Sequence, residues 1–134
     1  MSIKPLGLRL ILCLSLLPCA VDAQPLRTGA ELFMDYCTQC HGDDGRGYGV
    51  LMDKRPDALP DLRTLAKRNH GVFPVKRVFK IVSGGVDIEM HDVPNMPAWR
   101  DVFRFREDQG DATAREHTLN LVQYLTQIQD PVTR

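Results

Sequence analysis

Five consecutive residues constrain this chain more than any other stretch: Cys37-Thr38-Gln39-Cys40-His41. On a helix, the two thiols and the imidazole would share one face, because positions i, i+3 and i+4 are neighbours there. A Cys-x-x-Cys-His run is typical of covalent haem attachment, in which both thiols form thioethers to the haem vinyl groups. The neutral imidazole of His41 can then bind the iron. The pattern therefore predicts that the chain binds haem.

Four other interpretations of the cysteine pair fit the sequence less well. Free thiols without a function are disfavoured in the oxidising compartment to which an exported protein goes. A structural zinc site needs four protein ligands, and beyond Cys37, Cys40 and His41 it would depend on a distant histidine. A thioredoxin-like redox pair needs a strand followed by a helix, and the sequence has no alternating strand pattern. A simple disulfide suits the spacing but leaves His41 unexplained. We therefore favour haem and keep the disulfide for the case that no haem is attached.

The first 23 residues are typical of a secretory signal peptide. Lys4 and Arg9 precede an apolar run at residues 10–17, and Val21-Asp22-Ala23 supplies small residues at a cleavage site. The apolar stretch ends at residue 20, so it is far shorter than the roughly 20 residues that span a membrane. We therefore expect cleavage after residue 23 and export to the periplasm.

The remaining residues, 24–134, are long enough for one domain. Cys37 and Cys40 are its only cysteines, because the other two lie in the signal peptide. Lipid attachment at Cys19 is an alternative to simple cleavage, but Pro18 before it is a poor fit. The chain has 17 Lys and Arg against 17 Asp and Glu, and this balance argues against nucleic acid as a partner. We expect a monomer with no membrane span after cleavage.

Apolar residues at helical spacing predict two helices with one buried face each. The first begins near Pro74 and ends before Gly84, and the second runs from about residue 111 or 112 to residue 128. Their apolar residues are Val75, Val78, Phe79 and Val82 in the first, and Leu121, Tyr124, Leu125 and Ile128 in the second. Residues 101–113 match no functional pattern and are expected to form an exposed connector.

A further helix is expected after Thr28, which is a suitable N-cap. Gly29 and Phe33 lie on one stripe of this helix, and a glycine allows two helices to approach closely. They could therefore cross Leu121 and Tyr124 of the last helix tightly, although ordinary amphipathic packing would bury the same residues. Because no stretch predicts a strand with its alternating pattern, the expected fold class is all-α.

Residues 29–128 resemble a class I c-type cytochrome, a small single-haem electron carrier. The similarity is carried by the haem motif and by residues 29–33, 41–47, 60–62 and 96–99, with Leu121 and Tyr124 placed as in the family's last helix. The resemblance implies a cytochrome c-like fold of three to five helices, wrapped around one covalently attached haem, with crossing N- and C-terminal helices. It also implies electron transfer between redox partner proteins rather than an enzymatic reaction.

The resemblance assigns further residues to the haem site. The carbonyl of Pro60 corresponds to one that accepts a hydrogen bond from the iron-bound histidine, although Pro56 lies in the same loop. Met96 falls in the loop that supplies the second iron ligand. Trp99 follows, where its indole N–H can reach a propionate or its ring can simply fill the core. The expected haem-binding residues are thus Cys37, Cys40, His41, Met96, Pro60 and Trp99, with His41 and Met96 on the iron.

The residues themselves also favour Met96 as the second iron ligand. A thioether sulfur stabilises reduced iron, and Pro94 and Pro97 stiffen the backbone on both sides of Met96. Met90 is the main rival, because it lies in the same loop. Ligation by a second histidine is a further alternative, for which the candidates are His70, His91 and His117.

The charge distribution is uneven despite the balanced total. Residues 54–80 hold eight Lys and Arg against two Asp, a net charge of +6, whereas the flanking parts of the domain are acidic. Such a stretch could steer docking to an acidic redox partner or could be an ordinary solvated surface.

Two other functions remain open from the sequence. One is a haem enzyme or ligand-binding cytochrome, which needs a displaceable distal ligand. The prolines that bracket Met96 argue against this, because a stiff loop keeps a weak iron–sulfur bond closed. The other is a haem-free exported thiol or disulfide protein built on Cys37 and Cys40.

Overall fold

The computed structural model of the chain describes residues 25–52, 59–84, 96–106 and 110–132. The expected signal peptide at residues 1–23 lies outside these residues, and so do Pro56, Met90 and His91. The described residues contain six α-helices, two 3-10 helices and no strand, so the expected all-α fold class is confirmed. Two of the six, α2 and α3, are single turns of four residues.

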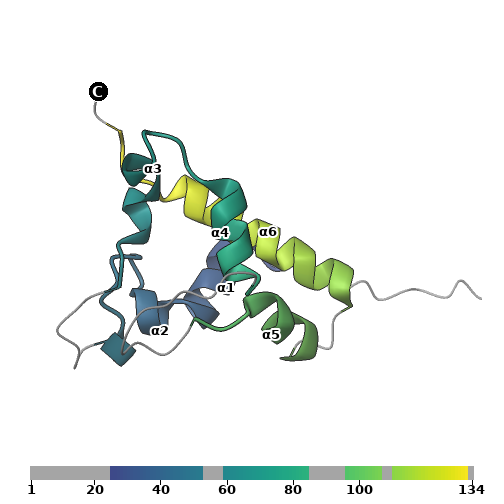
Figure 1. The fold of residues 1–134 in the computed structure, drawn as a ribbon. Coiled ribbons are helices and arrows are strands. Elements are labelled where there is room, and N and C mark those ends of the chain that lie inside the picture. Colours follow the sequence, from purple (N-terminus) through teal and green to yellow (C-terminus); the bar gives the residue numbers. More distant parts are fainter. Residues whose placement is uncertain (1–24, 53–58, 85–95, 107–109, 133–134) are drawn as a thin grey trace, which may run out of the picture.

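The helices are, in chain order, α1 (Gly29–Tyr36), α2 (Thr38–His41), the 3-10 helices η1 (Val50–Met52) and η2 (Leu62–Thr64), α3 (Leu65–Arg68), α4 (Val75–Val82), α5 (Trp99–Arg106) and α6 (Asp111–Gln127). The long helix α6 contacts three other helices, because α1, α4 and α5 all pack against it (Figure 1). The buried core residues are Leu32, Phe33, Val78, Val82, Phe103, Leu121, Val122 and Leu125. In the part of the chain that the structure describes, no helix is long and apolar enough to cross a membrane.

The start of α1 is fixed by a reciprocal pair of hydrogen bonds. The backbone N–H of Glu31 donates to the hydroxyl of Thr28, and the carboxylate of Glu31 accepts from the backbone N–H of Thr28 at 2.8 Å. Each bond satisfies a donor that a helix end would otherwise leave unpaired. The hydrogen bonds from the Thr28 backbone and hydroxyl also lower the pKa of Glu31. Thr28 is thus the N-cap that the sequence predicted.

Gly29 is buried where α1 crosses α6. A Cβ at this position would lie 2.0 Å from the backbone oxygen of Asn120 and 2.6 Å from Cβ of Tyr124. One turn later, the rings of Phe33 and Tyr124 are 5.4 Å apart. The predicted close crossing of the first and last helices is therefore confirmed. It requires a glycine at position 29, because any side chain there would overlap α6.

Two further hydrogen bonds hold the residue before Thr28 on α6. The backbone N–H of Arg27 donates to Nε2 of His117 at 3.3 Å, and the side-chain amide of Asn120 donates to the carbonyl of Arg27 at 2.9 Å. His117 is fully buried, with its ring edge-on to Phe103. These bonds therefore attach the residue that precedes the N-cap of α1 to α6.

The helix α4 has the bounds that the sequence predicted, with Pro74 at its N-cap and Gly84, in the left-handed region, just past its end. The prediction of an exposed connector at residues 101–113 is wrong for residues 101–106, because they belong to α5. Phe103 of α5 is fully buried and packs toward α6. The apolar residues Trp99, Val102 and Phe103 do have helical spacing, but charged residues separate them from any longer pattern.

The crossing at Gly29 generates the first prediction. Gly29→Ala should lower the free energy of unfolding by about 1–3 kcal/mol, because the added methyl overlaps the backbone of α6 and forces the helices apart. The measurement is urea denaturation of the haem-loaded protein, followed by circular dichroism.

Gly110→Ala is the matched control, because a Cβ added at Gly110 has nothing within 4 Å. Its effect should stay below about 1 kcal/mol. Equal destabilisation by the two substitutions would show that the α1–α6 crossing does not require glycine.

Candidate functional site

The cysteines and the histidine of the motif lie on one turn of helix. Cys37 caps the end of α1, and the backbone N–H groups of Cys40 and His41 both donate to its carbonyl, at 3.2 and 2.8 Å. Both thiols are free. Because the three residues have positions i, i+3 and i+4 on this turn, their side chains leave the same side of the backbone.

Cys37, His41 and Met96 line one cavity, which is partly open to solvent. The rest of the wall is apolar. Phe33, Leu121 and Leu125 contribute from α1 and α6. The remaining part of the wall comes from η2, α3 and α4 and consists of Leu62, Leu65, Val78, Ile81 and Val82. The fold thus places Met96 and His41, which are distant in sequence, around the same apolar space.

Burial keeps both the imidazole and the first thiol uncharged. It lowers the pKa of His41, so at neutral pH the ring keeps the lone pair with which a histidine binds a metal. Burial, with a smaller electrostatic contribution from Cys40, raises the pKa of Cys37 to about 12. A protonated thiol is a poor nucleophile for disulfide exchange, so Cys37 lacks the property that a thiol-redox centre requires.

The glycine-rich loop after the motif folds back on His41. The backbone N–H of Gly47 donates to the carbonyl of His41 at 2.8 Å, and the N–H of Leu59 donates to the carbonyl of Gly47 at 3.2 Å. Gly47 has a φ of 92°, and a Cβ there would lie 1.9 Å from the oxygen of Leu59. Only glycine allows this loop to bring residue 59, and with it Pro60, to the haem motif.

The expected hydrogen bond between His41 and the carbonyl of Pro60 stays a prediction. Nδ1 of His41 is buried and has no hydrogen-bond partner among the described residues, and Pro60 is exposed and does not line the cavity. Trp99 is also absent from the described cavity wall. Its ring packs against those of Tyr36 and Phe103, with centroids 5.5 and 6.3 Å away. A bond from Trp99 to a propionate likewise stays a prediction.

The other candidate iron ligands in the described part of the chain lie away from the cavity wall. Met34 is half exposed on α1, and Met52 is buried in η1. His70 is exposed in a turn, and His117 is occupied by the backbone of Arg27. Apart from Cys37 of the haem motif itself, Met96 is therefore the described side chain with a metal-binding atom that shares the cavity with His41.

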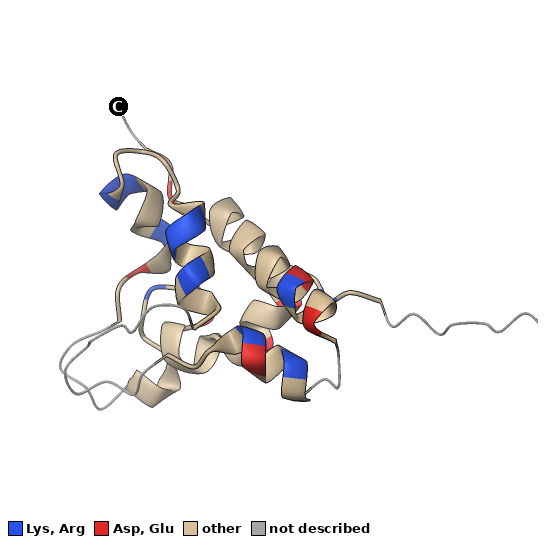
Figure 2. Cartoon of the chain, turned by 45° about the vertical axis from the view of Figure 1, so that its right-hand side comes forward, with Lys and Arg blue, Asp and Glu red and all other residues tan. Residues whose placement is uncertain are grey.

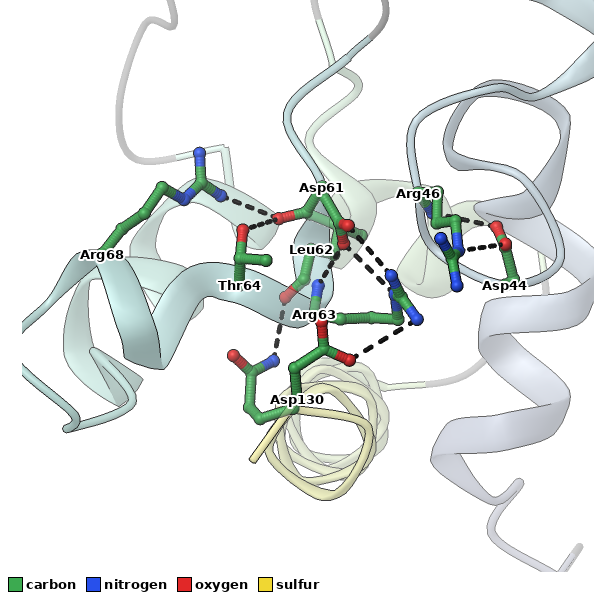
Figure 3. Close-up of polar contacts among 9 residues, drawn as sticks. Asp44, Arg46, Asp61, Leu62, Arg63, Thr64, Arg68 and Asp130 are labelled. Atoms are coloured by element: carbon green, nitrogen blue, oxygen red, sulfur yellow. Dashed lines mark hydrogen bonds and ion pairs between the residues drawn. The ribbon is translucent and has the colours of Figure 1, made fainter. Parts of the chain in front are cut away.

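A polar network that the sequence did not suggest holds the cavity wall formed by η2 and α3. Arg63 lies between Asp61 and Asp130 and pairs with both, at 3.1 and 3.5 Å (Figure 3). Partial burial alone would raise the pKa of Asp61, but its hydrogen bonds with Arg63 outweigh burial and lower it. The backbone N–H of Asp130 also donates to the carbonyl of Arg63 at 2.8 Å.

Gln129 makes the most specific contacts of this network. Its side-chain amide donates to the carbonyls of Leu62 and Leu125, at 2.8 and 2.7 Å, and accepts from the backbone N–H of Ala66 at 2.9 Å. Leu62 and Leu125 both line the cavity. One amide therefore joins the end of α6 to the wall segment that contains Leu62.

Comparison with known families agrees with this geometry. Residues 24–115 match the family model described as cytochrome c oxidase, cbb3-type, subunit III. The chain belongs to this family of c-type cytochromes. It is also 35% identical, over 83 residues, to the quinohemoprotein alcohol dehydrogenase ADH-IIG of Pseudomonas putida. That alignment covers 61% of this chain but only 9% of the dehydrogenase. No solved structure matches the chain.

Family membership establishes the cofactor and the general activity. Cytochrome c domains bind covalently attached haem c, so this c-type cytochrome carries haem iron and takes part in haem-based electron transfer. The residues present fit such a group, since an apolar cavity is lined by a free thiol, a neutral buried imidazole and a thioether.

The contacts of Gln129 generate a second prediction. Gln129→Ala should lower the free energy of unfolding by about 1–3 kcal/mol, because it leaves backbone groups beside the cavity without their partner. Gln127→Ala is the matched control, since Gln127 is exposed at the end of α6, two residues before Gln129, and its effect should be within about 0.5 kcal/mol. Urea denaturation of the haem-loaded variants measures both values. A Gln129 variant as stable as the Gln127 variant would contradict the joining role of this amide.

Proposed function

We propose that this chain is a periplasmic carrier of single electrons, with haem attached through Cys37 and Cys40 and iron bound by His41 and Met96. The observation that carries the proposal is the cavity in which Cys37, His41 and Met96 meet among apolar side chains. Cys40 lies on the same helical turn as Cys37 and His41. This donor set matches a site in which iron is bound from both sides and cycles between two oxidation states.

Each part of the site has a defined task in this proposal. Bound haem c supplies the Fe(III)/Fe(II) couple. The thiols of Cys37 and Cys40 fix the position of the group, and the uncharged ring of His41 provides a nitrogen ligand. The sulfur of Met96 favours the reduced state and raises the potential. The apolar wall from Phe33 and α6 keeps water away from the iron, which also disfavours side reactions with solvent.

We place the function in the periplasm because residues 1–23 have the pattern of a cleaved signal peptide. The family match begins at residue 24, directly after the proposed cleavage point, and covers residues 24–115 of the proposed cytochrome domain at residues 24–134. The carrier breaks no substrate bond, so it is not itself an enzyme. Since its relatives include an oxidase subunit family and a dehydrogenase, we assign it the role of a subunit or partner of such an enzyme.

Covalent attachment is tested by a visible spectrum. Protein expressed in the periplasm should keep c-type bands after acid–organic extraction, which strips haem that is not covalently bound. The weak ferric sulfur–iron charge-transfer band should be present as well. The double variant Cys37→Ala with Cys40→Ala should lose its haem in the same extraction. A wild-type protein without haem, from cells that attach it to other cytochromes, would overturn the proposal and favour the disulfide interpretation.

Replacement of the methionines tests the second iron ligand. Met96→Ala should retain covalent haem, lose the sulfur–iron charge-transfer band and show a lower reduction potential, because a thioether stabilises reduced iron. Met90→Ala is the control and should keep the band and the potential. If the effects of the two substitutions are reversed, Met90 is the ligand. If neither removes the band, the assignment to this segment is wrong.

A further inference from the structure

The helices α3 and α4 each have two chemically distinct sides. Leu65 of α3 and Val78, Ile81 and Val82 of α4 line the cavity. The side chains directed outward include five exposed cations, which we call the basic face: Lys67, Arg68, Lys76, Arg77 and Lys80. An α-helix is only about 10 Å across, so a protein bound to the basic face would be separated from the cavity by a single helix.

We propose that the basic face is the docking surface for an acidic patch on a redox partner protein. This inference rests on the proposed carrier function, and it identifies which side of the molecule receives the partner and what chemistry that partner presents.

The charges of the basic face are not neutralised within the described part of the chain. Neither α3 nor α4 contains an acidic residue, and Lys67, Lys76, Arg77 and Lys80 form no ion pair with a described residue. Most of the described arginines elsewhere differ, because carboxylates pair with Arg27, Arg46, Arg63, Arg100 and Arg115, whereas Arg104 lies over the ring of Phe105. Figure 2 shows the contrast, with blue segments alone on α3 and α4 and mixed colours on α5 and the start of α6.

Unpaired charges of one sign on one side of a protein create a field that raises the rate of encounter with an oppositely charged partner. Two exposed apolar residues, Val72 and Val75, lie in the chain between the cations of α3 and those of α4. Their side chains are 66% and 49% exposed. Protein interfaces commonly combine such apolar contacts with a charged rim. The composition of this surface therefore suits a protein that docks and leaves quickly.

An anionic membrane is the other surface that could attract these cations. A helix that lies on a membrane buries its apolar side in the lipid. The apolar side of α4 faces the cavity, where Val78 and Val82 are buried in the core of the protein. It is therefore not free to enter a membrane, and the observations favour a protein partner.

The test compares two double variants with the same change in net charge. Lys76→Glu with Lys80→Glu alters the basic face, whereas Arg104→Glu with Arg115→Glu alters exposed positions on α5 and α6. The probe is a small acidic blue copper protein as electron acceptor, and stopped-flow absorbance gives the second-order rate constant at low and high salt. The haem content and reduction potential of each protein are measured first and should be unchanged.

At low salt the basic-face variant should react about tenfold or more slowly than the wild type. The α5–α6 variant should remain within about threefold. At high salt the difference should largely disappear, because ions screen charges on exposed groups. Equal slowing by the two variants would show that net charge alone matters and would overturn the docking surface. A wild-type rate that does not respond to salt would overturn it as well.

Three further outcomes separate a failure of the docking surface from a failure of the carrier proposal. If wild-type protein binds vesicles of phosphatidylcholine and phosphatidylglycerol, and the basic-face variant does not, the cations serve a membrane and the protein-docking proposal is wrong. If the wild type contains covalent haem but gives the same rates as both variants, the carrier function stands and the docking surface fails. A wild type without covalent haem overturns the carrier proposal instead.

Discussion

The close crossing of α1 and α6 is the contact on which the rest of the structure depends. It is possible because Gly29 has no Cβ, so the backbone of α1 can lie against the carbonyl of Asn120. The helix α1 leads directly into Cys37 and the turn that contains His41, while α6 supplies Leu121 and Leu125 to the wall of the same cavity. The crossing therefore fixes where the haem motif lies relative to the part of the wall that α6 forms. The bonds from Arg27 to His117 and Asn120 fix where along α6 the crossing occurs.

The features that the sequence predicted correctly are those determined by neighbours in the chain. The Cys-x-x-Cys-His turn, the cap at Thr28 and the bounds of α4 each depend on residues within a few positions of one another. The crossing at Gly29 is a partial exception, since a glycine on an apolar stripe indicates close approach but not the partner. The placement of Met96 beside the cavity could be expected only because the family resemblance supplied long-range information.

The features that the sequence did not predict depend on contacts between distant residues. The helix α5 has only a short apolar pattern, and its stability comes from Phe103, which is buried against His117 of α6. His117 itself is a polar residue on an apolar face, and its role is clear only when the backbone of Arg27 is seen beside it. Gln129 follows the last helix and gives no local signal, yet it bonds to a segment more than sixty residues earlier.

The aromatic contacts around Trp99 connect the segment that contains Met96 to the segment that contains His41, the two proposed iron ligands. Trp99 begins α5, three residues after Met96, and its ring packs on that of Tyr36. Tyr36 is the last residue of α1 and directly precedes Cys37. Phe103 contacts both rings and is buried against α6. The segment with Met96 is thus held against the end of α1, the helix that leads into the haem motif, so the sulfur and the imidazole are positioned by one cluster. A ligand held this way does not depend on the stiffness of its own loop alone, and this disfavours the displaceable distal ligand that an enzymatic haem site requires.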